Sequence, residues 1–198
     1  MQSNKVVVPG ARDVRATLDV PEGETDTIVV ACPPHPQFNG NRRDNRLVVL
    51  GEYLTDHGIA CLRFDYGDWD EGYGEREDAR NAIRWARERY GSVGIFGFSF
   101  GGGVAALAGA DEAVDVIGLL APASRLTDDL DAVEVLDGIA VPLKILYATR
   151  DDTANWEPIV ERAEELGFET EAFSADHFFV GQEKKVARRL GEFFVGQF

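Results

Sequence analysis

The sequence predicts an α/β fold, with a mainly parallel twisted β-sheet covered by helices on both faces. Short apolar runs rich in β-branched residues alternate with amphipathic helical segments along the whole chain. The central runs are apolar at consecutive positions, which is typical of strands buried on both faces of a parallel sheet. The chain has 198 residues and no linker rich in Pro, Gly or Ser. Residues 1–198 are therefore expected to form one domain.

Eight strands are expected from the apolar runs. They are Lys5–Val8, Val14–Val20, Thr27–Cys32, Ile59–Phe64, Val93–Gly97, Val116–Leu120, Leu143–Ala148 and Thr170–Phe173. The first two runs are separated by Pro9-Gly10 and a few further residues, with no helix between them. They should therefore form an antiparallel hairpin that leads into the parallel strands.

Five helices are expected between and after these strands. They are Asn45–His57, Arg76–Tyr90, Ser99–Ala110, Asn155–Leu166 and Glu183–Phe194. The third is small and apolar throughout, so it should be buried. His57 ends the first helix just before Gly58, where a histidine commonly interacts with the terminal carbonyls. The segment Leu126–Gly138 is too short for a large lid, so only a minimal lid is expected.

The charge and composition exclude several classes of function. A net charge of −15 makes nucleic acid an unsuitable partner, because phosphate backbones would repel the chain. No apolar run approaches the roughly 20 residues that a membrane-spanning helix needs. Cys32 and Cys61 lie in apolar runs and are interpreted as reduced thiols of a cytoplasmic protein, with no metal site. The acid-rich, lysine-poor balance resembles that of proteins from salt-loving microbes.

The segment Gly97-Phe98-Ser99-Phe100-Gly101 fits the pattern G-x-S-x-G between an expected strand and an expected helix. A serine at such a turn has strained backbone geometry, and small neighbours allow the turn to close. The helix N-terminus beneath it favours negative charge. The alternatives are a glycine-rich packing turn or a phosphate-binding loop. We interpret Ser99 as a nucleophile because suitable partners follow it in order.

A serine hydroxyl needs a base, which is usually a histidine. Where a strand-turn-helix serine works with an acid and a histidine, the chain order is Ser, then Asp or Glu, then His. Of the three histidines only His177 follows Ser99, so His177 is the predicted base. Asp151 and Asp152 follow the expected strand Leu143–Ala148. We favour Asp151 as the orienting acid, while Asp152 with Thr153 could start the next helix.

Four segments resemble small hydrolases related to dienelactone hydrolase, in the α/β-hydrolase superfamily. They are Pro34–Gly40 with Asp44-Asn45, then Leu62–Gly67, then Gly97–Gly103, and finally Ala175–Phe179. In the first segment Pro33 stands where the family has a histidine, and Asn39 where it has a glycine. The resemblance implies the α/β-hydrolase fold. It also implies an oxyanion hole formed by two backbone N–H groups, from Phe100 and from the His35–Phe38 loop, where we favour Gln37.

These residues together predict acyl transfer to water, with a small-molecule ester or thioester as substrate. Ser99 would attack the carbonyl, His177 would move the proton and Asp151 would orient His177. No metal or organic cofactor is required. A monomer or homodimer without nucleic-acid or membrane partners is expected. Five side chains are candidates for substrate binding: His35, Phe38, Tyr66, Trp69 and Phe178. The alternatives are an amide or peptide hydrolase with the same triad, and an interaction module whose catalytic site has decayed.

Overall fold

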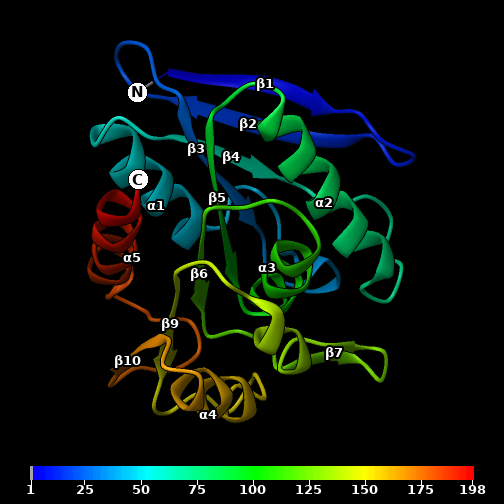
Figure 1. Cartoon of the computed structure of the whole chain (residues 1–198), viewed down its shortest axis with the longest axis vertical. Helices are drawn as coiled ribbons and strands as arrows, with labels where there is room; N and C mark the ends of the chain where they lie inside the picture. Colours follow the sequence, from blue (N-terminus) through cyan, green and yellow to red (C-terminus); the bar gives the residue numbers. More distant parts are fainter. Residues whose placement is uncertain (1) are drawn as a thin grey trace.

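The computed structural model describes residues 2–198, which form one eight-stranded sheet with helices on both sides (Figure 1). The strand order is β1-β2-β4-β3-β5-β6-β9-β10. The strands are β1 (Gln2–Val8), β2 (Val14–Val20), β3 (Thr27–Cys32), β4 (Ala60–Phe64), β5 (Ser92–Phe98), β6 (Val116–Leu120), β9 (Leu143–Ala148) and β10 (Glu169–Phe173). The β1-β2 and β2-β4 pairs are antiparallel, and all other pairs are parallel. The predicted fold class and the N-terminal hairpin are confirmed.

Five α-helices cover the sheet. They are α1 (Asn45–Asp56), α2 (Tyr73–Arg87), α3 (Phe100–Asp111), α4 (Glu157–Glu165) and α5 (Glu183–Gln197). Buried side chains of α1 and α5 belong to one hydrophobic cluster, and those of α2, α3 and α4 belong to another. The two clusters lie on opposite faces of the sheet, because successive residues of a strand point to opposite sides. The layers are therefore helix, sheet and helix.

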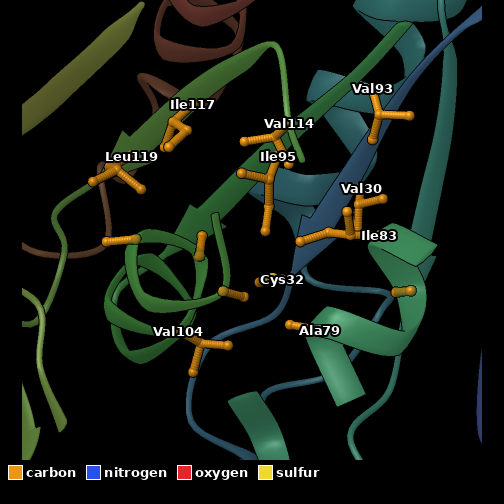
Figure 2. Packing of buried hydrophobic residues seen from close by; sticks show 14 of the residues in the cluster. Val30, Cys32, Ala79, Ile83, Val93, Ile95, Val104, Val114, Ile117 and Leu119 are labelled. Atoms are coloured by element: carbon orange, nitrogen blue, oxygen red, sulfur yellow. The ribbon is translucent and has the colours of Figure 1, made fainter. Parts of the chain in front are cut away.

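Strand β3 shows this division residue by residue. Val29 and Ala31 pack with α1 and α5, whereas Val30 and Cys32 pack with α2 and α3. Figure 2 shows the second group, with Val30 of β3 beside Ile83 of α2; Cys32 and Val104 of α3 belong to the same cluster. Full burial of one such aliphatic side chain contributes about 1.5–3 kcal/mol. The run Thr27–Cys32 is apolar on both faces because both faces are covered.

The two cysteines are free and buried within these clusters. Burial raises the pKa of the Cys61 thiol to about 12, and the carboxylate of Asp19 acts in the same direction. Both thiols are therefore protonated at neutral pH and behave as small apolar side chains.

Helix α2 begins at Tyr73, three residues before the expected Arg76. The cause is Glu75, whose buried carboxylate accepts hydrogen bonds from the N–H groups of Gly72 (2.8 Å) and Asp70 (3.0 Å). A side chain that binds back to the first N–H groups stabilises the start of a helix.

Helix α4 begins at Glu157, and no side chain caps it. The expectation that Asp152 and Thr153 start this helix near Asn155 is therefore wrong. Pro158 occupies the first turn, where its fixed φ fits the helix and its missing N–H costs nothing.

The segment between β6 and β9 contains a small hairpin that the sequence analysis did not predict. It comprises β7 (Arg125–Thr127) and β8 (Leu130–Asp131), followed by a 3-10 helix at Glu134–Gly138. A bulge interrupts the short pairing. Strands of three and two residues give no readable alternation, so local pattern alone does not reveal them.

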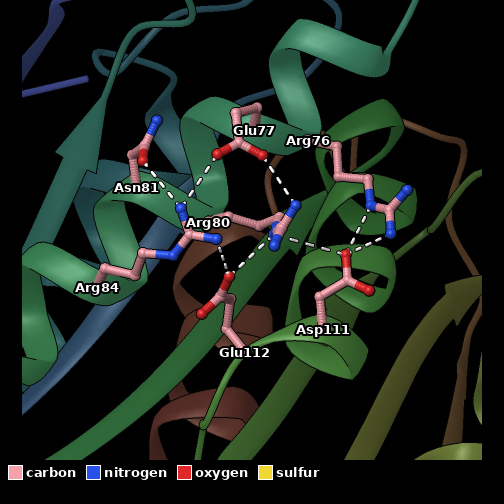
Figure 3. Close-up of polar contacts among 7 residues, drawn as sticks. All are labelled: Arg76, Glu77, Arg80, Asn81, Arg84, Asp111 and Glu112. Carbon is pink, nitrogen blue, oxygen red and sulfur yellow. Dashed lines mark hydrogen bonds and ion pairs between the residues drawn. The ribbon is translucent and has the colours of Figure 1, made fainter. Parts of the chain in front are cut away.

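Ion pairs link the exposed face of α2 to the end of α3 (Figure 3). Arg76 pairs with Asp111, while Arg80 and Arg84 both pair with Glu112. Burial opposes ionisation of Glu112, but hydrogen bonds from these two arginines hold its pKa below the ordinary value. At this helix contact, three arginines thus match the acidic side chains of Asp111 and Glu112. Within residues 2–198, no helix has the length and apolar character needed to cross a bilayer.

Candidate active site

Ser99 lies at the tight turn between β5 and α3, with φ 60° and ψ −122°. The flanking glycines leave the space that this turn needs. A Cβ on Gly97 would lie 1.9 Å from the carbonyl oxygen of Gly101, and a Cβ on Gly101 would lie 2.3 Å from that of Pro33. The Ser99 N–H donates to Leu120 O (2.9 Å), which fixes the turn against β6. The strained serine predicted from the pattern is therefore present.

His177 approaches Ser99 from the loop between β10 and α5. Its Nε2 lies 2.9 Å from Ser99 Oγ, and its side chain is 3% exposed. The ring packs against Phe98, with ring centroids 5.2 Å apart. His57 lies elsewhere, at the end of α1, where its Nδ1 is 2.7 Å from Tyr53 O. The sequence-predicted base is thus the histidine that reaches Ser99.

Asp151 completes the arrangement from the loop after β9. Its Oδ2 lies 2.6 Å from His177 Nδ1, and its side chain is fully buried. Its Oδ1 accepts hydrogen bonds from the N–H groups of Thr153 (2.9 Å) and Ala154 (3.0 Å). These bonds fix the carboxylate, which in turn favours the imidazole tautomer with a proton on Nδ1. The Nε2 lone pair is then directed at the Ser99 hydroxyl. Asp152 is exposed.

The loop after β3 places His35 beside the nucleophile turn. Its ring packs against Trp69 (centroids 4.5 Å apart) and Phe100 (4.7 Å), which also contact each other. Burial lowers the pKa of His35, and the carboxylate of Glu75 offsets this in part. The neutral imidazole accepts a hydrogen bond at Nδ1 from the Gln37 N–H, 3.2 Å away. The backbone amide that we favoured for the oxyanion hole is therefore engaged inside its own loop.

A cavity of about 390 Å³ opens at Ser99 and His177. Its lining comprises Pro34, His35, Phe38, Asn39, Gly40, Asp44, Arg46, Phe98, Ser99, Thr153, His177 and Phe178. Three of the five predicted substrate-binding residues are among them: His35, Phe38 and Phe178. Phe38 is 81% exposed and Phe178 is 50% exposed, so both rings stand at the open rim.

Tyr66 and Trp69 do not line this cavity. The Tyr66 hydroxyl donates to Pro33 O (3.1 Å), which directs the ring beneath the His35 loop. Trp69 packs against the His35 and Phe100 rings and lines a different hollow, with Arg12, Asp68 and Asp70. Both rings support the loop rather than form the wall beside Ser99.

The sequence analysis missed several lining residues. Phe98 is one of the variable positions inside G-x-S-x-G, and the pattern gives it no role. Arg46 directly follows Asp44-Asn45, which formed part of the resemblance, but one charged residue in a helical first turn is normally solvated. Thr153 was considered only as a helix start. Thr153 lies two residues after the predicted acid Asp151, and this closeness was the available sign of a place near the site.

Comparisons of the sequence with known proteins give one partial match. No protein-family model matches the chain. Over 90 residues, the chain is 34% identical to an uncharacterized protein of Rickettsia prowazekii. This match covers 39% of the chain and only 37% of the length of that protein.

Solved structures match over nearly the whole length. An alpha-beta serine hydrolase homologue from Coxiella burnetii has a TM-score of 0.81 at 22% identity, covering 97% of both chains. Est1E from Butyrivibrio proteoclasticus has a TM-score of 0.85 at 16% identity, covering 98% of both. Dienelactone hydrolase from Anabaena variabilis has a TM-score of 0.77 at 22% identity, covering 99% of this chain and 98% of that one. These likenesses, together with the strand order and the helices on both faces, show that the chain has the α/β-hydrolase fold.

Proposed function

We propose that the chain is a serine hydrolase that cleaves a small carboxylic ester or thioester through an acyl-enzyme intermediate. One observation carries the proposal: Ser99 Oγ, the His177 imidazole and the Asp151 carboxylate form a continuous chain with separations of 2.9 and 2.6 Å. Nucleophile, base and orienting acid in mutual hydrogen-bonding reach are what acyl transfer needs. The serine hydrolase and dienelactone hydrolase among the similar structures support the same class of reaction.

In the first half-reaction, Ser99 Oγ attacks the carbonyl carbon while His177 Nε2 takes the hydroxyl proton. The tetrahedral intermediate then collapses. Its bond to the leaving oxygen or sulfur breaks, and His177 returns the proton to that atom. In the second half-reaction a water molecule replaces the leaving group. His177 takes a proton from that water as the water oxygen attacks the acyl carbon. The bond between the acyl carbon and Ser99 Oγ then breaks, His177 returns the proton to Oγ, and the acid product leaves.

Two backbone N–H groups would stabilise the negative oxygen of the intermediate. The Phe100 N–H is the first of α3, so no carbonyl within the helix accepts its hydrogen bond. The second donor would come from the His35–Phe38 loop. Gln37 can serve if its N–H leaves His35 Nδ1 when the intermediate forms. Each such donor contributes about 3–4 kcal/mol to transition-state stabilisation.

The cavity favours small substrates. A volume of about 390 Å³ lies near the lower end of ordinary ligand pockets. Phe38, Phe98 and Phe178 give it apolar walls, and the β7–β8 hairpin is too small to form a large lid. A short acyl group on an accessible ester fits these features better than a long-chain lipid.

The decisive experiment compares the wild-type protein with Ser99→Ala. The wild-type protein should react with a fluorophosphonate probe and turn over p-nitrophenyl acetate, and the variant should do neither. Turnover of p-nitroanilides in place of esters would identify an amide hydrolase. No labelling and no turnover by a folded wild-type protein would favour the interaction module.

A further inference from the structure

The loop that carries His177 is strained and needs contacts from outside itself. Phe179 has a φ of 51° and Gly181 a φ of 76°. A left-handed conformation at a non-glycine residue costs about 1–3 kcal/mol and persists only where neighbouring structure enforces it. The ring of Phe179 is fully buried and packs on Phe173, with centroids 5.9 Å apart. The Phe178 ring is half exposed, so it anchors the loop much less.

The backbone of Phe178 is held at both of its polar groups. Its N–H donates to Asp176 Oδ1 (3.0 Å), a contact within the same loop. Its carbonyl oxygen accepts a hydrogen bond from Arg46 Nη1 (3.2 Å). Arg46 belongs to the first turn of α1, 132 residues earlier in the chain. Through Arg46 the residue next to His177 is attached to a helix far from it in sequence.

Arg46 is fixed in place independently of Phe178. Its Nε donates to Asp44 Oδ1 (2.8 Å), and its Nη2 pairs with Asp44 Oδ2. Asp44 also caps α1 by accepting the Arg46 N–H (2.9 Å). The guanidinium carbon lies 4.4 Å from the centroid of the Phe98 ring, and the side chain is 16% exposed. A guanidinium held this way loses little further rotamer freedom when it binds a carbonyl.

Phe98 connects this arginine to the base. The Phe98 ring contacts the Arg46 guanidinium and also the His177 ring, whose centroid is 5.2 Å away. All three side chains line the cavity at Ser99. A displacement of Arg46 would therefore free the Phe178 carbonyl and also remove one support of the ring that packs on the imidazole.

We propose that Arg46 is a positioning residue for His177, a role that rests on the hydrolase function proposed above. It holds the Phe178 carbonyl while the imidazole takes and returns the proton, so that Nε2 keeps its alignment with Ser99 Oγ. Alignment matters because a misplacement of about 1 Å can cost about 100-fold in rate.

A second role for Arg46 would be direct binding of an anionic part of the substrate, since it lines the cavity. The contacts favour the positioning role, because three of the five N–H donors already bind Asp44 and the Phe178 carbonyl, and the Asp44 carboxylate offsets the positive charge. The two roles predict different kinetics. Loss of a positioning contact lowers kcat on a neutral ester, whereas loss of a binding contact raises KM and does so for anionic substrates only.

The kinetic test uses Arg46→Met and Arg46→Lys with neutral p-nitrophenyl acetate. We expect Arg46→Met to lower kcat about tenfold, equivalent to about 1.4 kcal/mol, with KM within about twofold of wild type. Arg46→Lys should give an intermediate kcat, because one ammonium cannot span both Asp44 and the Phe178 carbonyl. The matched control is Arg43→Met, an exposed neighbour outside the cavity, which should match wild type. Thermal melting shows which variants are folded.

Proton NMR supplies a readout that does not depend on turnover. The His177 Nδ1–H, bonded to Asp151, should give a sharp far-downfield resonance in wild type and Arg43→Met. In Arg46→Met that resonance should broaden as the loop loosens. An unchanged resonance with unchanged kcat in folded Arg46→Met would overturn the proposal, and so would a change in KM alone. Should the wild type hydrolyse no ester, the hydrolase proposal fails, and the NMR comparison alone then decides the role of Arg46.

Discussion

His177 Nδ1 lies 2.6 Å from Oδ2 of Asp151, a carboxylate 26 residues earlier in the chain. The neighbouring Asp152 is exposed. Two adjacent aspartates therefore have opposite environments. Substituting each in turn separates the effect of the hydrogen bond that orients His177 from the effect of a negative charge in the loop.

Asp151→Asn should lower kcat for ester hydrolysis severely, while Asp152→Asn should leave it near wild type. An amide keeps the Oδ1 contacts to Thr153 and Ala154 but no longer fixes the productive tautomer. In serine proteases this replacement costs about 10⁴-fold in kcat. Steady-state kinetics with p-nitrophenyl acetate measures both variants. An equal loss in the two variants would contradict the assignment.

Gly97→Ala should destabilise the fold by more than about 4 kcal/mol, the range of severe core defects. The added Cβ would meet backbone, the Gly101 carbonyl oxygen at 1.9 Å, and backbone has no room to move there. Gly196→Ala in α5 is the control, because no atom outside its own stretch of helix lies within 4 Å of its Cβ position. Urea unfolding should show the control to be as stable as wild type or slightly more stable. Similar stability of both variants would contradict the argument about the turn.

The contribution of Asp78 to the free energy of unfolding should fall as the pH rises from about 4 to 6. Burial raises the pKa of Asp78 to about 6, although the Gly67 N–H and Arg12 oppose this. In that window the folded state keeps a proton that the unfolded state has released, so raising the pH favours unfolding. Asp78→Asn removes the group. Its free energy of unfolding relative to wild type should therefore increase from pH 4 to pH 7, as measured by urea titrations. A relative stability that stays flat or decreases would contradict the raised pKa.

The melting temperature should rise between dilute buffer and molar KCl. A net charge of −15 produces self-repulsion that salt screens, and the composition resembles that of proteins from salt-loving microbes, so we propose that the protein works at high salt. Screening also weakens ion pairs such as those between α2 and α3, but exposed pairs contribute little individually. Differential scanning calorimetry in KCl tests the balance. A constant or falling melting temperature would count against a high-salt setting.

Sequence reasoning succeeded where patterns are local and repeated. The run Thr27–Cys32 has both faces apolar, which predicts its place inside a covered sheet. G-x-S-x-G located the strand-to-helix turn, and chain order selected His177, which the structure brings to Ser99. The place of Asp151 just after the strand Leu143–Ala148 made it the favoured acid, and the structure brings it to His177. Each of these conclusions needed only neighbouring residues or their order.

It failed where a particular side-chain contact, whether local or between distant segments, decides the outcome. The start of α2 depends on the hydrogen bond from the Gly72 N–H to the Glu75 carboxylate. Glu75 is one of several charged residues in this segment, and the pattern does not single it out. Arg46 joins the site because its guanidinium meets a carbonyl 132 residues away. Tyr66 and Trp69 are predicted to bind substrate, yet the Tyr66 hydroxyl binds Pro33 O, Trp69 lines another hollow, and neither lines the cavity at Ser99. The spacing of residues along the chain does not show where the side chains of Arg46, Tyr66 and Trp69 point in the fold.

The backbone at Ser99 has a consequence for the evolution of this protein. A φ of 60° there penalises every residue with a side chain, and glycine alone would adopt it freely. Ser99→Gly should thus increase the stability of the fold and abolish the proposed hydrolase activity. Selection for heat resistance alone would drive the position toward glycine, so the serine persists only while some biological demand rewards its hydroxyl.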